Sequence, residues 1–415
     1  MPPIKLQALL KNTLKICFIA FLIPQPRLTF KVSLSTSMPK PTRILIAPDK
    51  FKGSLTAAEA AHAIKRGVKQ VWPDADVRVI PIADGGEGTA DLIRSVRGGE
   101  WISTTVRDPL GRPVHAQYLW LADTATAVID MSAASGLWRL KLNERDPLKA
   151  STFGTGELIM DAIRRKAKQV VVGLGGSATN DGGIGMAAAL GYGFLTSDGE
   201  PVEAVPANLP ALTSIKADDL PAMPELVAAC DVGNPLLGIS GATRVFGGQK
   251  GADEKTRDFL ETALENLADV AAQSLGCDFR NEAGAGAAGG LGFGLLTFCH
   301  ARIRSGFEVV AECLNLAEEV ISADLVITGE GSLDAQTLGG KGPAGIAKLA
   351  RKHGRRVIAF AGVISDDGQL NEIFDAVCPL ANGPLSVEES MRNAANLLEQ
   401  SALRSARLIH LGKFI

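Results

Sequence analysis

The run of residues 170–185, VVVGLGGSATNDGGIG, constrains the fold of this chain more than any other segment. Its valines are typical of a buried strand, and they lead directly into a loop of glycines and small polar residues. Glycine lets the main chain approach a ligand closely because it lacks Cβ and tolerates a positive φ. The N–H groups of such a loop bind anions, and side chains such as Asn180 and Asp181 supply oxygen ligands. The run therefore predicts phosphate chemistry at the end of a strand.

Strands and helices alternate at both ends of the chain, an order that indicates an α/β fold with a parallel sheet. Residues 100–130 instead alternate strands and turns, which predicts a β-rich insertion or second domain. Thr56 and Glu59 have the spacing of a capping box at one helix start. The other expected strands are 43–47, 76–82, 226–231, 324–328 and 356–361, and the expected helices are 56–72, 89–96, 156–167, 291–303, 344–352 and 387–407. Ligands bind at the carboxyl edge of such sheets, so we expect the polar clusters after the strands to share one site.

The composition argues against nucleic acids and membranes as partners. Lys and Arg number 43 against 45 Asp and Glu, the net charge is −2, and aromatic residues make up 5%. Neither a basic patch nor a base-stacking platform is therefore expected. The six cysteines form no C-x-x-C pair, which favours reduced thiols and a cytoplasmic location. No segment reaches the roughly 20 apolar residues that span a bilayer.

Residues 1–37 differ in character from the rest of the chain. Lysines precede a short apolar run there, which resembles a secretory leader, but no small-x-small cleavage site follows. We expect translation to start at Met38, so that residues 1–37 are a non-native N-terminal extension.

The segment after the first strand reads APDKFKGS and contains a charged cluster. Asp49 follows Pro48 at the expected strand end, and we expect it to take part in catalysis. Lysine in a loop that opens a helix can hold a phosphate or a carboxylate as a point charge. Lys50, Lys52 and Ser54 are therefore candidates for binding or charge stabilisation. The alternative is a solvated turn with ordinary surface lysines.

Carboxylates between glycines follow two other strands. Asp84 and Glu87 lie in ADGGEGT, and Glu330 and Asp334 lie in DLVITGEGSLDAQTLGGK. Carboxylates with little steric cover suit Mg²⁺, which takes oxygen ligands and keeps several waters, so these four are the candidate metal ligands. Lys341 follows two glycines and is a candidate for anion binding. The alternatives are a helix N-terminal role for Glu87 and a solvated loop around Glu330.

Further polar residues are candidates for binding phosphate or substrate. Thr152 and Thr155 lie in STFGTGE before a helix, although an N-cap alone would explain Thr155. Asp231 follows the strand that ends in LVAACD. Lys250 lies between glycines in GGQKG, where a hairpin turn is the alternative. The flexible glycines of GAGAAGG complete the set: Gly286, Gly289 and Gly290.

Two glycine patterns leave a different class of enzyme open. Residues 173–178 fit the dinucleotide fingerprint G-x-G-x-x-A, with Asp198 about twenty residues further on, and residues 284–289 fit G-x-G-x-x-G. A nicotinamide-dependent hydroxy-acid oxidoreductase is therefore an alternative. Against it, residues 180–183 (NDGG) break the helix that the first fingerprint requires, and no strand precedes the second.

Taken together, these segments resemble the glycerate kinase type I family. The resemblance runs from about residue 43 to the C-terminal region, and residues 1–37 lie outside it. The motifs that carry it are APDKFKGSL (47–55), ADGGEGT (83–89), STFGTGELI (151–159), GLGGSATNDGG (173–183), ACDVGNPL (229–236), GGQKGA (247–252), GAGAAGGLG (284–292) and ITGEGSLDAQT (327–337).

The resemblance implies transfer of the γ-phosphoryl group of ATP to D-glycerate with Mg²⁺, which gives a phosphoglycerate. It also implies two α/β domains, the second inserted into the first, with the active-site cleft between them. We therefore expect a Rossmann-like parallel sheet in residues 41–95 and 290–415, and a mixed, β-rich α/β domain in residues 96–289. The family favours the 2-hydroxyl, with 3-phosphoglycerate as the alternative product, and a homodimer is compatible with it.

Phosphoryl transfer needs positioning and charge neutralisation more than covalent help, and this chemistry sets the expected roles. Asp181 is expected to be the base that orients the attacking hydroxyl, and Lys52 is expected to stabilise charge on the transferred group. The loops at 173–183 and 284–292 would hold the phosphates or the glycerate carboxylate, and which loop takes which stays open. In the first loop the candidate ligands are Gly175, Gly176, Ser177 and Asn180.

Overall fold

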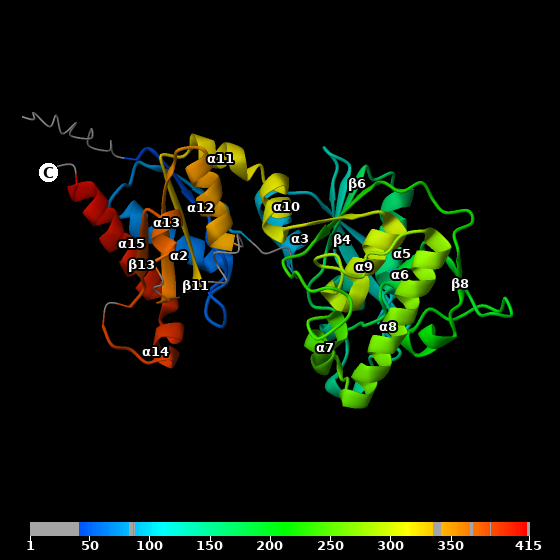
Figure 1. Ribbon diagram of the computed structural model, residues 1–415. Helices are drawn as coiled ribbons and strands as arrows, with labels where there is room; N and C mark the ends of the chain where they lie inside the picture. The colour runs from blue at the N-terminus through cyan, green and yellow to red at the C-terminus, as the bar shows by residue number, and fades with distance from the viewer. Residues whose placement is uncertain are drawn as a thin grey trace, which may run out of the picture. The chain divides into compact units, whose positions relative to one another are not determined.

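Two large β-sheets, each flanked by helices, make up the chain in the computed structural model (Figure 1). The structure describes residues 41–82, 86, 88–334, 342–365, 368–381 and 383–412. All of these fall within one compact unit, Lys40–Ile415. A two-stranded ladder of β7 (Gly193–Leu195) and β8 (Ser214–Lys216) accompanies the two large sheets. The expected fold class, α/β with one parallel and one mixed sheet, is confirmed.

The first sheet has five parallel strands in the order β13-β12-β11-β1-β2. They are β13 (Ala376–Pro379), β12 (Arg356–Ile364), β11 (Leu325–Leu333), β1 (Arg43–Ile46) and β2 (Asp76–Val79). The chain passes from β1 to β2 on one side and continues through β11 on the other, so the strand order reverses between β1 and β11. Ligands of open parallel sheets bind outside the carboxyl ends of the strands at such a reversal.

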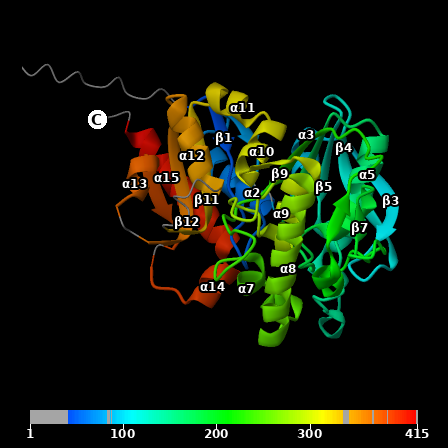
Figure 2. The same ribbon diagram turned by 45° about the vertical axis from the view of Figure 1, so that its right-hand side comes forward.

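Alternating residues of β1 divide the core of the first sheet between its two faces. Ile44 and Ile46 pack with α2 (Ala57–Lys69) and α15 (Ala394–Leu411), whereas Leu45 belongs to the cluster that contains α12 (Gly342–Lys352). Figure 2 shows α12 and α15 beside this sheet. The predicted capping box is present, since Thr56 Oγ1 accepts the Glu59 N–H at 3.2 Å and the Glu59 side chain caps the Thr56 N–H.

The second sheet has the order β10-β9-β6-β5-β4-β3. Its strands are β10 (Arg302–Arg304), β9 (Glu225–Ala229), β6 (Gln169–Gly173), β5 (Thr126–Asp130), β4 (Pro113–Leu121) and β3 (Glu100–Arg107). The pairs from β5 to β10 are parallel, and β3, β4 and β5 pair antiparallel. The turn predicted at DPLG joins β3 to β4, where the Gly111 N–H donates to Asp108 O at 3.0 Å.

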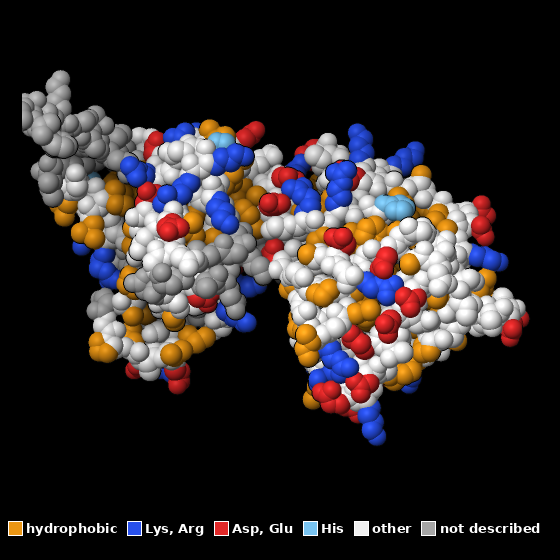
Figure 3. All heavy atoms as spheres, viewed as in Figure 1, with side chains coloured by type: hydrophobic (Ala, Val, Ile, Leu, Met, Phe, Trp, Pro, Cys, Tyr) orange, Lys and Arg blue, Asp and Glu red, His pale blue; other side chains and the backbone are white. Residues whose placement is uncertain are grey.

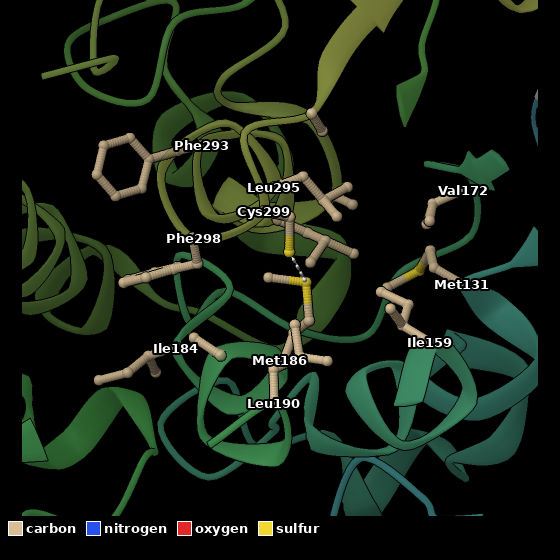
Figure 4. Close-up of a cluster of buried hydrophobic side chains, with 14 of the residues drawn as sticks. Met131, Ile159, Val172, Ile184, Met186, Leu190, Phe293, Leu295, Phe298 and Cys299 are labelled. Atoms are coloured by element: carbon tan, nitrogen blue, oxygen red, sulfur yellow. Dashed lines mark hydrogen bonds between the residues drawn. The ribbon is translucent and has the colours of Figure 1, made fainter. Parts of the chain in front are cut away.

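An apolar core lies between one face of the second sheet and the helices that cover it. The core contains residues of α5 (Phe153–Arg164), α6 (Ile184–Ala189), α8 (Glu254–Leu275) and α9 (Ala287–Cys299). Figure 4 shows Phe293, Leu295 and Phe298 of α9 in the same cluster as Met186 of α6, whose Sδ lies 4.0 Å from Cys299 Sγ. On the opposite face of the second sheet, side chains of α3 (Thr89–Arg97) and α10 (Gly306–Cys313) pack with the strand residues that point to that side.

The remaining helices are short. They are α4 (Ser132–Ser135), α7 (Ala242–Phe246), α11 (Leu316–Ser322), α13 (Leu370–Ile373), α14 (Val387–Arg392) and the 3₁₀ helices η1 (Leu137–Arg139), η2 (Leu142–Glu144), η3 (Pro206–Ala211) and η4 (Gly248–Lys250). No helix in the described ranges is both long enough and apolar enough to cross a bilayer. Figure 3 shows basic and acidic side chains interspersed over the visible face, in line with the net charge of −2.

Several element boundaries differ from the sequence-based expectation, and three of the differences have a clear structural cause. The helix expected over 291–303 ends at Cys299, because His300 has a φ of +50° and the next residues pair with β9 as β10. α9 and β10 therefore pack with the second sheet, beyond the expected boundary at residue 289. The helix expected over 387–407 is two helices that meet at Asn393, and β11 extends to Leu333 because it pairs with the equally long β12.

Candidate active site

Asp49 and Glu330 lie on neighbouring chain segments at the strand reversal of the first sheet. The Asp49 N–H donates to Gly329 O at 2.8 Å, which sets Asp49 beside the residue that precedes Glu330. Asp49 is 9% exposed and Glu330 is half-buried. Asp49 follows β1 and Glu330 lies within β11, which continues beyond the expected strand end, and two carboxylates on adjacent segments are a donor set that suits Mg²⁺. In the described ranges no group of three or more His, Cys, Asp or Glu has the arrangement of a complete metal site.

The loop between β1 and α2 presents its lysines to solvent. Lys50 and Lys52 are exposed, while the Lys50 N–H donates to Asp49 Oδ1 at 2.6 Å. The Ser54 hydroxyl donates to Phe51 O at 3.0 Å and so closes the turn. The sequence therefore correctly predicts charged groups at this strand end, and their roles stay predictions.

Asp84, Glu87 and Lys341 lie outside the described residues. Asp334 follows β11 directly, and the Ser332 hydroxyl lies 3.5 Å from Asp334 Oδ2.

The loop after β6 carries a row of main-chain donors. The flanking groups are fixed, since Leu174 N–H donates to Ala229 O at 3.1 Å and Ala178 N–H donates to Ser135 O at 2.9 Å. Between them, the N–H groups of Gly175, Gly176 and Ser177 meet no acceptor among the described residues. Gly176 is exposed and has a φ of +69°. Successive unpaired N–H groups around a left-handed glycine form an anion-binding turn.

Asp181, four residues after this row, lies inside the protein. It is 0% exposed. Its Oδ2 accepts the N–H and the hydroxyl of Thr152 at 2.7 and 2.8 Å and the Gly185 N–H at 3.2 Å, while its Oδ1 accepts the Gly183 N–H at 3.0 Å. Burial raises the pKa of this carboxyl, and the hydrogen bonds oppose the shift. Asp181 thus joins the starts of α5 and α6, and a base that meets a substrate hydroxyl has no support in this geometry.

Other predicted binding residues are also buried. Thr152 and Thr155 are 0% exposed, and Thr155 Oγ1 lies 2.8 Å from Ser135 Oγ. Asn180 is 0% exposed and donates through Nδ2 to Thr243 Oγ1 at 2.9 Å. These side chains hold the loop from within, so direct contact with a ligand, as the sequence suggested, has no support here.

Lys250 is 1% exposed, which is unusual for a lysine. Its Nζ donates to Thr179 O at 2.6 Å. Burial lowers the pKa of Lys250 from 10.5 to about 7, while the charge of Asp181 opposes the shift. The expected hairpin-turn alternative is not observed, because η4 carries this lysine into the core.

The glycines of GAGAAGG serve close packing of one main chain on another. A Cβ on Gly289 would lie 1.9 Å from Thr179 O, and one on Gly290 would lie 2.8 Å from Gly182 Cα. Gly286 is equally confined, with Pro235 O at 2.1 Å from its Cβ position. All three glycines are buried. The expected phosphate cradle at 284–292 therefore has no exposed N–H groups at these positions.

The helix that a dinucleotide fingerprint requires is absent after Gly175. α6 begins only at Ile184, beyond a loop, and its N-cap is Gly183 with a φ of +78°. The oxidoreductase alternative therefore has no structural support.

Asp231 is held by two hydrogen bonds at the wall of a cavity. Asp231 Oδ1 accepts the Ser305 hydroxyl at 3.1 Å and the Gly306 N–H at 3.0 Å, and it lines a cavity of about 490 Å³ with Glu282. A cavity of about 590 Å³ is lined by Gly88, Asp130, Ser132, Trp138 and Arg139, among others. The sequence patterns did not single out Arg139, because a single arginine in a 3₁₀ turn carries no motif.

Comparison with known proteins identifies the family. Residues 44–410 match the glycerate kinase family. The chain is 45% identical to the glycerate kinase of Bacillus subtilis strain 168 over 378 residues, which covers 89% of this chain and 98% of the relative. It is 40% identical to the glycerate 2-kinase of Escherichia coli K12 over 375 residues, again 89% and 98%.

A solved structure agrees with these relatives. A crystal structure assigned to glycerate kinase 2 from Salmonella typhimurium LT2 superposes with a TM-score of 0.79 at 40% identity, covering 90% of this chain and 100% of that one. The fold and the matches together define a phosphotransferase. The chain belongs to the glycerate kinase family, as the sequence motifs predicted.

Proposed function

We propose that this kinase transfers the γ-phosphoryl group of ATP to the 2-hydroxyl of D-glycerate, which gives 2-phosphoglycerate. Family membership supports glycerate as the acceptor. The name of the relative in Escherichia coli, glycerate 2-kinase, supports the 2-hydroxyl over the 3-hydroxyl.

The row of N–H groups at Gly175, Gly176 and Ser177 carries the proposal. We assign phosphate oxygens of ATP to this row, because adjacent main-chain donors bind phosphate without needing a charged side chain. Ser177 is 8% exposed, whereas Gly176 beside it is exposed to solvent. Gly176 has a φ of +69°, which disfavours other residues, and its lack of a Cβ leaves room for a phosphate to approach the N–H groups.

Asp49 and Glu330 are the described carboxylates that best fit Mg²⁺. Two carboxylates leave room for the waters and phosphate oxygens that this ion keeps in its octahedral shell. Asp334, Asp84 and Glu87 remain candidate ligands on the same grounds. When bound, Mg²⁺ would neutralise charge on the phosphate oxygens.

Lys52 would stabilise the charge that develops on the transferred group, because it is exposed in the loop between β1 and α2 and bears a full positive charge. Lys50 and Ser54, from the same loop, are our candidates for holding the glycerate carboxylate. Asp181 has a different part in this proposal from the base that the sequence suggested. It fixes the starts of α5 and α6, and through them the loop that holds the phosphates.

ADP release, followed with D-glycerate, L-glycerate and no acceptor, tests the proposal. We expect release that depends on D-glycerate and on Mg²⁺. Absence of ADP together with reduction of NAD(P)⁺ in the presence of glycerate would instead establish the oxidoreductase. A cytoplasmic location and a homodimer stay predictions, for cell fractionation and sedimentation to test.

A further inference from the structure

One short segment holds two consecutive residues of the loop after β6. The segment runs from α7 to η4, and it contributes Thr243 and Lys250. Thr243 Oγ1 accepts a hydrogen bond from Asn180 Nδ2 at 2.9 Å, and Lys250 Nζ donates to Thr179 O at 2.6 Å. All four residues are at most 1% exposed. The segment from α7 to η4 therefore anchors the loop after β6 through two hydrogen bonds in the interior, away from solvent.

If these two hydrogen bonds are lost, few others hold Thr179 and Asn180 in place. Within the described part of the chain, Asn180 Oδ1 and Thr179 Oγ1 are buried without a hydrogen-bond partner. Loss of the Thr243 hydroxyl would leave the Asn180 amide with no partner at all. A buried polar group without a partner is costly, so the loop would move to regain one.

Thr179 and Asn180 are separated from the row of donors at Gly175, Gly176 and Ser177 by a single residue, Ala178. Before the row, Leu174 N–H donates to Ala229 O at 3.1 Å, and within it Gly176 O accepts the N–H of Leu137, the first residue of η1, at 2.8 Å. The direction of the three N–H groups thus depends on anchors at both ends. On the far side the Ala178 N–H donates to Ser135 O at 2.9 Å, and the Thr243 and Lys250 pair holds the next two residues.

We propose that Thr243 and Lys250 are positioning residues for the phosphoryl donor: they aim the N–H row at the phosphates of ATP without touching the nucleotide. This inference rests on the proposed function above, and it replaces the direct contact between Lys250 and an anion that the sequence suggested. As in the proposed function, the loop after β6 binds ATP and not glycerate.

Thr243→Val is the decisive variant, because it keeps the shape of the side chain and removes one acceptor. Thr243→Ser restores the hydroxyl, and Thr262→Val makes the same change at an exposed site on α8. Lys250→Met removes the second anchor. We expect Thr243→Val and Lys250→Met to raise the KM for ATP about tenfold or more, which reflects a lost binding geometry. The KM for glycerate should stay within about twofold, and Thr243→Ser should recover most of the loss.

Hydrogen exchange on the ligand-free protein gives a readout that needs no activity. We expect faster exchange at the Ala178 and Gly182 amides in Thr243→Val, and slower exchange around residues 175–178 of the wild type when ATP is added without glycerate. Equal loss of affinity for both substrates, or unchanged exchange in Thr243→Val, would overturn the inference. A wild type that phosphorylates no glycerate would refute the proposed function alone, because the exchange result still decides whether the anchors position the loop. If Lys250→Met does not fold, Thr243→Val decides the matter.

Discussion

Asp181 accepts both the N–H and the hydroxyl of Thr152 on a single carboxylate oxygen, at 2.7 and 2.8 Å. This contact joins the start of α5 to the glycine-rich loop after β6. Asp181, which the sequence suggested as a catalytic base, is therefore a buried support for that loop.

Asp181→Asn should therefore destabilise the fold. The amide would turn an N–H₂ group toward N–H donors, and a buried acceptor lost in this way costs about 2–4 kcal/mol. Urea unfolding measures the difference, with Asp198→Asn as an exposed control that should change stability by less than about 0.5 kcal/mol. A variant of wild-type stability with no activity would contradict this role and would restore the base.

Gly289→Ala should also destabilise the protein strongly, because the new Cβ would lie 1.9 Å from Thr179 O. Gly276→Ala is a matched control: Gly276 has nearly the same φ, +73° against +71°, but nothing lies within 4 Å of its Cβ position. We expect a loss of about 1 kcal/mol for Gly276→Ala, from the left-handed backbone alone. Gly289→Ala should lose about 3 kcal/mol or more, because main-chain overlap adds to that cost. Equal losses for the two variants in thermal or urea unfolding would show that Gly289 does not pack against Thr179 as described.

Lys52→Ala should lower kcat at least about a hundredfold, which is the usual effect of removing a group that stabilises transition-state charge. The melting temperature should hardly change, since Lys52 is exposed. Lys255→Ala, another exposed lysine, controls for a general loss of positive charge. Turnover of Lys52→Ala within a few fold of the wild type would remove Lys52 from the site.

The stability of the wild type relative to Lys250→Met should rise with pH above about 7. Burial lowers the pKa of Lys250 to about 7, whereas the unfolded chain keeps that proton up to the ordinary pKa of 10.5. Between these two values the unfolded state binds more protons, so raising the pH favours the folded state by up to about 1.4 kcal/mol per unit. Urea unfolding of both proteins from pH 6.5 upward, in steps to about pH 9.5, checks the sign, with Lys255→Met as the exposed control. A difference that is flat or falls with pH would show that Lys250 keeps its proton in the core.

Local patterns in the sequence predicted the features that depend on near neighbours. Thr56 and Glu59 form the predicted capping box, and Asp49 lies at a strand end as its flanking residues suggested. Burial could not be predicted in the same way. Lys250 is buried because η4 folds onto Thr179, 71 residues earlier, and no local pattern encodes that contact.

The glycines illustrate the same limit. Gly176 and Gly289 both lie in motifs that suggest a phosphate loop, yet Gly176 is exposed and Gly289 is pressed against Thr179. Sequence pattern gives the flexibility of such residues, whereas tertiary packing decides whether it serves a ligand or a neighbouring loop. The same reason explains β10, a short strand that forms because β9 lies beside it.

Phosphorus NMR of the product formed from ATP and D-glycerate tests the central claim most directly. We predict a new phosphomonoester signal that is a doublet, because phosphate on the 2-hydroxyl couples to the single proton on that carbon. A triplet would place the phosphate on the 3-hydroxyl and refute the proposed regiochemistry. No new phosphomonoester, with ATP unchanged, would contradict glycerate kinase activity itself.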